Sequence, residues 1–294
     1  MKVLAAVDKF RGTATAAQVA TAIGHACWQL GHDCIERPLA DGGEGTLDAL
    51  GGANRTTLVT GPLGKPVQAP WRLHRGTAVI EMACASGLML AGGKQENDPI
   101  AATTTGTGEL IDAALDLGAK RIIVCLGGSA TTDGGLGAVK AIQTPARLKG
   151  VEFVVACDVT TKFTDAAKVF APQKGASPAQ VQFLTTRLEK LVQVYQQSYG
   201  VDVSEISGAG AAGGLAGGLA AGFSAGAAYH ALCAAGGLGS RTQLTAPSAL
   251  AGNAHGVCAD DPRLAPGRRR QPACEVAGPQ GVTNVTATGV RPRS

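Results

Sequence analysis

Short apolar runs and longer amphipathic stretches alternate along residues 1–200 of the chain. The short runs are bounded by polar or Gly-containing segments, which is typical of buried strands. They are Lys2–Val7, Ala78–Met82, Arg121–Leu126 and Val151–Cys157. We expect a strand at each of them.

Three longer stretches carry apolar residues at every third or fourth position. Thr15–Leu30, Thr107–Leu117 and Pro178–Tyr195 therefore predict amphipathic helices. The apolar stripe of the last one comprises Val181, Leu184, Leu188, Leu191 and Val192.

The recurring order is strand, polar or Gly-rich loop, then helix. This order predicts an α/β protein with mainly parallel sheets. In such sheets ligands bind outside the carboxyl ends of the strands. The loops that begin at Asp8, Gly127 and Asp158 each follow a predicted strand, so we expect them to converge on one site.

Glycine is the unusual component of an otherwise globular composition. The chain is 45% apolar and 16% charged, but 42 of its 294 residues are Gly. Because Gly weakens helices and strands, this excess indicates loops that turn tightly or approach a ligand. Aromatic residues make up only 4%, which argues against a base-stacking platform for nucleic acid.

The net positive charge of the chain comes from residues 241–294. This segment has seven Arg, no Lys and three acidic residues, an excess of four that equals the net charge of the whole chain. It also holds six of the 14 prolines and no sustained periodicity, so we expect a poorly ordered tail. The neutral remainder offers no basic surface for a nucleic-acid partner.

Neither a membrane span nor a cysteine framework is indicated. The apolar stretch Ile206–Gly239 is built of Gly and Ala and contains His230, so it predicts a loop and helix packed against protein. Met1–Phe10 is too soon interrupted by charge to be a signal peptide. The eight cysteines include no Cys-x-x-Cys pair. We expect a cytoplasmic enzyme.

The segment Ala40–Thr46 places two carboxylates among three glycines. Asp41 and Glu44 could hold Mg²⁺ or a substrate hydroxyl, while the N–H groups of Gly42 and Gly43 could face an anion. The alternative is a surface turn before a helix, in which Glu44 favours the helix dipole.

Two further loops have the same character. Thr103–Glu109 precedes a predicted helix, so Thr104 and Thr105 could bind an oxyanion there, although an ordinary Thr N-cap is the alternative. Gly127–Gly137 follows a strand and carries the candidate residues Gly127, Gly128, Ser129 and Asp133. It lacks the Gly-Lys-[Ser/Thr] ending of a Walker A loop.

The charged residues after the first strand complete the candidate set. Asp8 could orient or deprotonate a hydroxyl, and Lys9 and Arg11 could neutralise a carboxylate or phosphate. Asp158, at the end of a later strand, is a further candidate of the same kind. An exposed charged loop is the alternative for Asp8–Arg11.

Taken together, these segments resemble the glycerate kinase family of two-domain α/β enzymes. The matching stretches follow the family order over most of residues 1–222. They are Asp8–Gly12, Ala40–Thr46, Gly61–Val67, Val79–Ala83, Ala85–Leu88, Thr103–Leu115, Gly127–Gly137, Ala156–Thr160, Val169–Ala176 and Gly208–Leu215.

The resemblance implies ATP-dependent, Mg²⁺-assisted phosphorylation of a hydroxyl of D-glycerate, with glycerate and a nucleotide as the small-molecule partners. The motifs and the resemblance together predict catalytic roles for Asp8, Asp41, Asp133 and Asp158, and Mg²⁺ ligation by Asp41 and Glu44. They predict substrate or phosphate binding by Lys9, Arg11, Gly42, Gly43, Glu44, Thr104, Thr105, Gly127, Gly128 and Ser129. Three questions stay open: which hydroxyl is phosphorylated, which residue is the catalytic base, and whether the protein is a monomer or a homo-oligomer.

The resemblance also implies a domain division. Residues 1–60 with roughly 200–240 would form one α/β domain and residues 61–199 a second, one of them flavodoxin- or Rossmann-like, with the active site in the cleft between them. The chain departs from the family by an internal deletion between Ala138 and Val155 and by its atypical ending at 241–294. The alternative function is therefore a catalytically impaired member that only binds an organic acid or nucleotide.

Overall fold

The computed structural model describes residues 1–10, 13–143, 145–223, 228–234 and 241–244. The strands are β1 (Lys2–Ala5), β2 (Asp33–Glu36), β3 (Arg55–Thr60), β4 (Pro66–His74), β5 (Thr77–Glu81), β6 (Arg121–Cys125), β7 (Glu152–Cys157), β8 (Ala228–Ala234) and β9 (Arg241–Leu244). The α-helices are α1 (Ala16–Gln29), α2 (Thr46–Ala49), α3 (Ala83–Ser86), α4 (Thr105–Asp116), α5 (Leu136–Ala141), α6 (Ala166–Phe170), α7 (Pro178–Tyr199) and α8 (Ala211–Phe223). The 3₁₀ turns are η1 (Met89–Ala91), η2 (Pro145–Leu148), η3 (Phe163–Asp165) and η4 (Pro172–Lys174).

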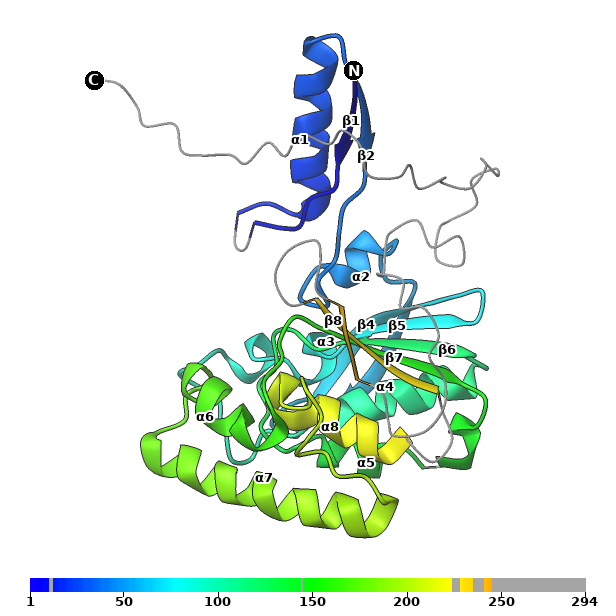
Figure 1. The fold of residues 1–294 in the computed structure, drawn as a ribbon. Helices are drawn as coiled ribbons and strands as arrows, with labels where there is room; N and C mark the ends of the chain where they lie inside the picture. Colours follow the sequence, from blue (N-terminus) through cyan, green and yellow to red (C-terminus); the bar gives the residue numbers. More distant parts are fainter. Residues whose placement is uncertain (11–12, 144, 224–227, 235–240, 245–294) are drawn as a thin grey trace, which may run out of the picture.

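A small β1–α1–β2 unit stands apart from the rest of the molecule (Figure 1). Its two strands are parallel, with Lys2 paired to Asp33 and Ala5 to Glu36. Helix α1 begins at a capping box in which the Thr15 hydroxyl accepts from the Gln18 N–H and the Gln18 side chain accepts from the Thr15 N–H. The sequence therefore sets the start of α1 through local hydrogen bonds.

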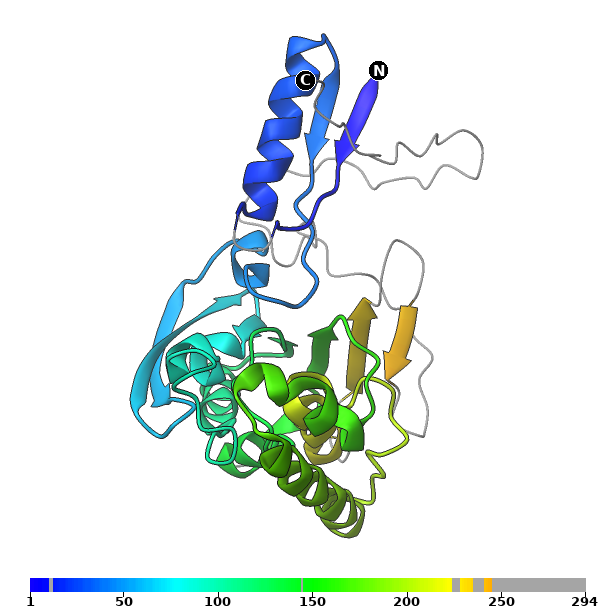
Figure 2. The same cartoon turned by 90° about the vertical axis from the view of Figure 1, so that its left-hand side faces the viewer.

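The body of the molecule is a sheet with strand order β3-β4-β5-β6-β7-β8-β9. The central strands β5, β6, β7 and β8 pair in parallel, whereas the pairings toward both edges are antiparallel. The predicted α/β fold class with mainly parallel sheets is confirmed. Figure 2 shows the small unit above the body from a second direction.

The two faces of the central sheet are buried under different elements. Ile80, Ile122 and Phe153 point to the face covered by α4, α5 and α8. Their neighbours Val79 and Ile123 point to the opposite face, where they pack against residues of and next to α2. Because side chains alternate along a strand, these parallel strands are apolar on both faces.

Helices α6, α7 and α8 enclose a second apolar cluster. Leu184, Leu188 and Leu191 from the predicted stripe of α7 are buried there, with Phe163 and Tyr195. Helix α7 begins at a second capping box, formed by Ser177 and Gln180. It extends to Tyr199, one turn beyond the predicted end.

The expected domain division needs correction. The boundary between residues 60 and 61 falls inside the β3–β4 hairpin, whose strands pair along their length. Ala211–Phe223 packs against the larger sheet, and Ala228–Ala234 pairs with β7, a strand of the expected second domain. The reason is that α8 is apolar all round and therefore needs a covered site, which the larger sheet provides.

The expectations for the apolar stretch Ile206–Gly239 and for the tail 241–294 can be compared with the structure only in part. Helix α8 confirms a protein-packed helix within Ile206–Gly239, and no helix in the described residues is long and apolar enough to cross a membrane. Arg241–Leu244, expected to be irregular, pairs with β8 as strand β9. The remainder of the predicted tail lies outside the described residues.

The contact between α4 and α5 depends on a missing side chain at Gly108. A Cβ added there would collide with the Ala138 carbonyl oxygen and lie 2.7 Å from the Ala138 Cα. Both obstacles are backbone atoms, so they cannot turn aside. The two helices therefore approach at a distance that only Gly permits.

We expect Gly108→Ala to lower the free energy of unfolding by about 2 kcal/mol, because the collision outweighs the better helix propensity of Ala. Chemical denaturation measures this change. The control is Gly24→Ala in α1, where the atoms that a Cβ would meet belong to the flexible Glu36 side chain. Equal unfolding free energies for the two variants would contradict the backbone collision.

Candidate functional site

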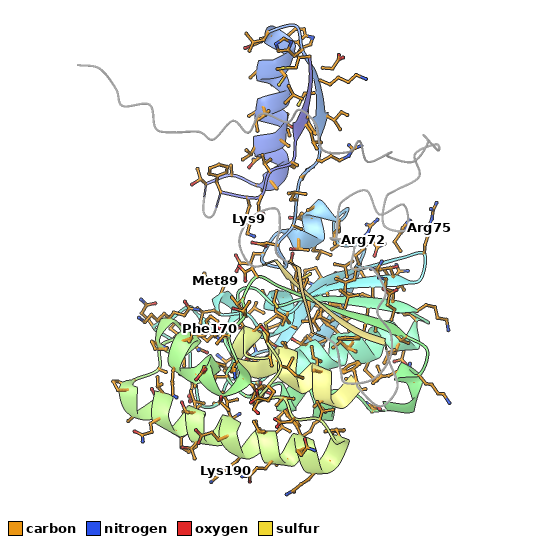
Figure 3. The ribbon with its side chains drawn as sticks, viewed as in Figure 1. Lys9, Arg72, Arg75, Met89, Phe170 and Lys190 are labelled. Carbon is orange, nitrogen blue, oxygen red and sulfur yellow. The ribbon has the colours of Figure 1, made fainter. Side chains whose placement is uncertain are left out.

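A cleft of about 1030 Å³ lies between the small unit and the carboxyl ends of β6 and β7. Lys9 marks its upper side at the base of the small unit, and Phe170 lies on the body below it (Figure 3). The candidate residues that line it are Asp8, Lys9, Asp41, Gly43, Glu44, Gly127, Gly128, Ser129 and Asp158. The expected convergence of the loops at Asp8, Gly127 and Asp158 is confirmed.

An ion pair between Lys9 and Asp41 crosses the cleft from the small unit to the body. Lys9 Nζ donates to Asp41 Oδ1 over 2.8 Å, and the Gly43 N–H donates to the same oxygen over 2.7 Å. Burial raises the pKa of Asp41, but these two hydrogen bonds outweigh it and leave the pKa below its usual value. Asp41 is therefore an ionised acceptor at neutral pH.

The Asp41–Gly45 loop rests directly on the ends of two strands. The Gly127 N–H donates to the Gly42 carbonyl oxygen over 3.0 Å. A Cβ at Gly42, whose φ is +86°, would lie 2.5 Å from the Ala156 carbonyl oxygen. Gly42 itself is buried beneath the loop and does not line the cleft. Its glycine serves the packing of the loop.

Glu44 and Gly128 meet at the next point of this contact. Gly128 has a φ of +73°, and a Cβ there would lie 2.7 Å from Glu44 Oε1. Beneath them, Glu81 Oε1 accepts from the Leu47 N–H over 2.6 Å and anchors α2. Burial raises the pKa of Glu81, and the backbone hydrogen bond from Leu47 only partly offsets this effect. Glu44 remains exposed at the cleft, as its candidate role requires.

Asp133, expected to be catalytic, lies in the interior and does not line the cleft. Its Oδ2 accepts from the Thr104 N–H and hydroxyl, each over 2.8 Å, and from the Gly137 N–H over 3.2 Å. Its Oδ1 accepts from the Gly135 N–H over 3.0 Å. A carboxylate held by four donors fixes the start of α5 against the start of α4. The expectation that Asp133 shares the cleft with Asp8 and Asp41 is wrong.

Of the two threonine candidates, Thr104 belongs to this interior network and Thr105 lies beside it. Thr104 is fully buried and also accepts from the Ala138 N–H over 3.0 Å. The hydroxyl of Thr105 shares a hydrogen bond with Thr103, and neither Thr104 nor Thr105 lines the cleft. Thr104 is the N-cap residue of α4 but makes no side-chain capping hydrogen bond, because its hydroxyl is used by Asp133 and Ala138. The ordinary Thr N-cap is therefore not what the structure shows at this position. Arg11 lies outside the described residues.

The sequence analysis missed Lys174, which lines the floor of the cleft although it is 2% exposed. Its Nζ donates to Ser129 Oγ over 2.7 Å and to the Thr131 carbonyl oxygen over 2.6 Å. Burial lowers the pKa of Lys174 to about 7, and the charge of Asp133 acts in the opposite direction. The available signal was a Lys within Pro172–Gly175, a turn flanked by apolar residues.

A strained backbone turn completes the floor of the cleft. Ala212 lines the cleft and has a φ of +53°, a backbone conformation that residues other than Gly rarely adopt. The following Gly213 and Gly214 also have positive φ values, and the Gly213 carbonyl accepts from the Gly134 N–H. This turn ties the start of α8 to the loop that carries Asp133.

Clustered metal ligands and reactive thiols are two further features that such a site could carry. In the described part of the chain, no group of three or more His, Cys, Asp or Glu side chains could hold a metal ion. Burial is also the main cause that raises the pKa of Cys84 to about 11, so this thiol is unreactive at neutral pH.

The sequence matches a known protein family over most of its length. Residues 3–145 and 139–232 match the sequence profile of the glycerate kinase family. The glycerate 2-kinase of Escherichia coli (strain K12) is 39% identical, and the glycerate kinase of Bacillus subtilis (strain 168) is 38% identical. Each alignment covers 72% of this chain and 66% of the relative, so the chain spans just under two thirds of their length.

The fold is similar to a solved structure of the same family. The crystal structure of a protein assigned as glycerate kinase 2 from Salmonella typhimurium LT2 superposes with a TM-score of 0.67 at 36% sequence identity. The match covers 78% of this chain and 71% of the other.

We expect Asp133→Asn to lower the free energy of unfolding by roughly 3 kcal/mol, because the amide replaces one acceptor oxygen with an NH2 donor that faces buried donors. Denaturant titration measures the effect. Asp158→Asn is the matched control, since Asp158 is exposed at the end of β7 and its change should stay within about 0.5 kcal/mol. If both variants were equally stable, the structural role of Asp133 would be refuted.

Proposed function

The chain belongs to the glycerate kinase family, and from this we propose that it transfers the γ-phosphoryl group of ATP to a hydroxyl of D-glycerate. The observation that carries the proposal is the meeting of three loops in one cleft: Asp8–Lys9, Asp41–Gly45 and Gly127–Ser129. They bring carboxylates, a cation and Gly-rich backbone together, which is the combination that phosphoryl transfer requires.

Within this proposal, Asp41 orients the reacting hydroxyl. Its Oδ1 accepts from Lys9 and Gly43, while Oδ2 takes part in neither of these two hydrogen bonds. Because its pKa is lowered, Asp41 is ionised and can accept a hydrogen bond from the hydroxyl, which orients the oxygen for its attack on phosphorus. Asp8 lies next to Lys9, 3.8 Å from its Nζ, and adds a second carboxylate to the same edge.

The cations and loops of the cleft hold the substrates. Lys9 offsets the negative charge that gathers when a carboxylate and phosphates enter together. The Gly127–Ser129 loop brings small glycines and the Ser129 hydroxyl to the cleft at the end of β6, where the hydroxyl could donate to an anionic ligand. Arg11 is proposed to act with Lys9 on the strength of its sequence position alone.

The carboxylates fit a Mg²⁺ ion only in company with the nucleotide. Mg²⁺ usually takes one or two carboxylates, several waters and substrate phosphates. Asp41 and Glu44 both line the cleft and could supply such ligands, and no cluster of three in the described residues would hold the ion alone. When bound, the ion would offset charge on the phosphates.

We propose a cytoplasmic location for the protein. Nothing in the comparisons favours the non-catalytic alternative.

We expect the purified chain to release ADP from MgATP only when D-glycerate is present, as measured by a coupled ADP assay. Asp41→Asn should lower kcat about 100-fold or more with a smaller change in KM, because the lost charge acts on the transition state. The control is Asp165→Asn, which alters an exposed carboxylate outside the cleft and should leave kcat unchanged. Failure of the wild-type chain to release ADP with any D-glycerate concentration would overturn the proposed function.

A further inference from the structure

Lys174 is a buried cation at the bottom of the cleft whose recorded partners are neutral. Its ammonium donates to the Ser129 hydroxyl and to the Thr131 carbonyl oxygen. Lys174 is only 2% exposed, and within the described part of the chain it forms no ion pair. Burying an ammonium without a counter-charge is unfavourable, so natural proteins rarely do it without a reason.

The surroundings hold Lys174 firmly in this position. The Asn97 amide donates to the Lys174 carbonyl oxygen over 2.8 Å and to the Ala130 carbonyl oxygen over 3.1 Å. The next residue, Gly175, has a φ of +99°, and a Cβ there would collide with the Lys94 carbonyl oxygen. The turn that carries Lys174 is therefore tied to the loop that carries Ser129.

Ser129 connects the ammonium to the open part of the cleft. Its Oγ accepts from Lys174, so its own hydroxyl proton is directed elsewhere. Ser129 and Lys174 both line the cleft, together with Gly128 and Ala212. An ammonium behind the oxygen polarises the O–H bond and strengthens any hydrogen bond that the hydroxyl donates.

We propose that Ser129 and Lys174 form an anion-binding subsite at the floor of the cleft, in which the Ser129 hydroxyl contacts an anionic oxygen of a substrate and Lys174 supplies the compensating charge. Ser129 is then a binding residue and Lys174 a positioning residue that acts through it. The identity of the substrates rests on the proposed function. The anionic oxygen belongs either to a carboxylate of the hydroxy acid or to a phosphate of the nucleotide.

Charge at Lys174 gives the subsite a distinctive pH dependence. With a pKa of about 7, Lys174 is protonated below that pH and loses its charge above it. Among the described residues, the charge of Asp133 raises the pKa of Lys174 and so favours its protonated form. Anion affinity should therefore fall as the pH rises from about 6 to about 8, since the neutral amine no longer offsets the ligand charge.

The test measures binding by isothermal titration calorimetry with D-glycerate, ADP and inorganic phosphate as separate probes. Lys174→Met keeps the unbranched stem and removes the charge, and Ser129→Ala removes the hydroxyl. Lys168→Met is the matched control, because Lys168 is 62% exposed on α6 and does not line the cleft. Thermal unfolding of each variant verifies that it is folded.

We expect Lys174→Met and Ser129→Ala each to raise the Kd of one probe about tenfold or more, because a charge-assisted hydrogen bond is lost. The double variant should be little worse than either single one, since both act on the same contact. The fall in affinity between about pH 6 and pH 8 should disappear in Lys174→Met, and comparison at each pH cancels titration of the ligand itself. An effect on D-glycerate alone assigns the subsite to the carboxylate, and one on ADP or phosphate assigns it to the nucleotide.

Unchanged affinities for all three probes in folded Lys174→Met, or an unchanged pH profile, would overturn the inference. So would a wild-type chain that binds none of the probes. If Lys174→Met does not fold, Ser129→Ala decides the question in the same assays. A wild-type chain that binds D-glycerate or ADP through Ser129 and Lys174 but releases no ADP from MgATP would overturn the kinase assignment and leave the subsite standing.

Discussion

The direct contact of the Asp41–Gly45 loop with the ends of β6 and β7 is the constraint on which the candidate site depends. The hydrogen bond from the Gly127 N–H to the Gly42 carbonyl closes this contact without an intervening side chain. The contact is made by backbone atoms of the residue next to Asp41, so it leaves little freedom in the position of Asp41. The ion pair with Lys9 then relates the small unit to the body through the same residue.

Buried charge in this protein is balanced by fixed dipoles and hydroxyls. Asp133 is held by four hydrogen bonds and Lys174 by two, and neither has an ion-pair partner within hydrogen-bond distance among the described residues. The two groups act on each other electrostatically, since Asp133 raises the pKa of Lys174. The interior below the cleft is thus polar and rigid, which limits reorganisation when charged ligands enter.

The sequence predicted the features that depend on local periodicity and on strand ends. The helix that begins at Pro178, the strands β6 and β7 and the convergence of their loops all followed from such patterns. Asp133 could not be placed, because a carboxylate among glycines looks the same in a cleft and in a buried network until its donors are known. The position of α8 depends on packing against strands that lie far away in the sequence, which no local pattern reports. Lys174 escaped notice for the opposite reason, since a single Lys in a turn usually lies in solvent.

The glycine contacts bear on how genetic data for such a site should be read. At Gly42, Gly127 and Gly213, an added Cβ would approach backbone atoms at 2.5 Å or less. Random mutagenesis would therefore score these positions as intolerant to every substitution, whatever ligand the cleft takes. Intolerance of that kind reports steric exclusion between main chains. Positions such as Ser129 and Glu44, where a side chain of different chemistry can be accommodated, are the ones at which a mutational profile carries information about the ligand.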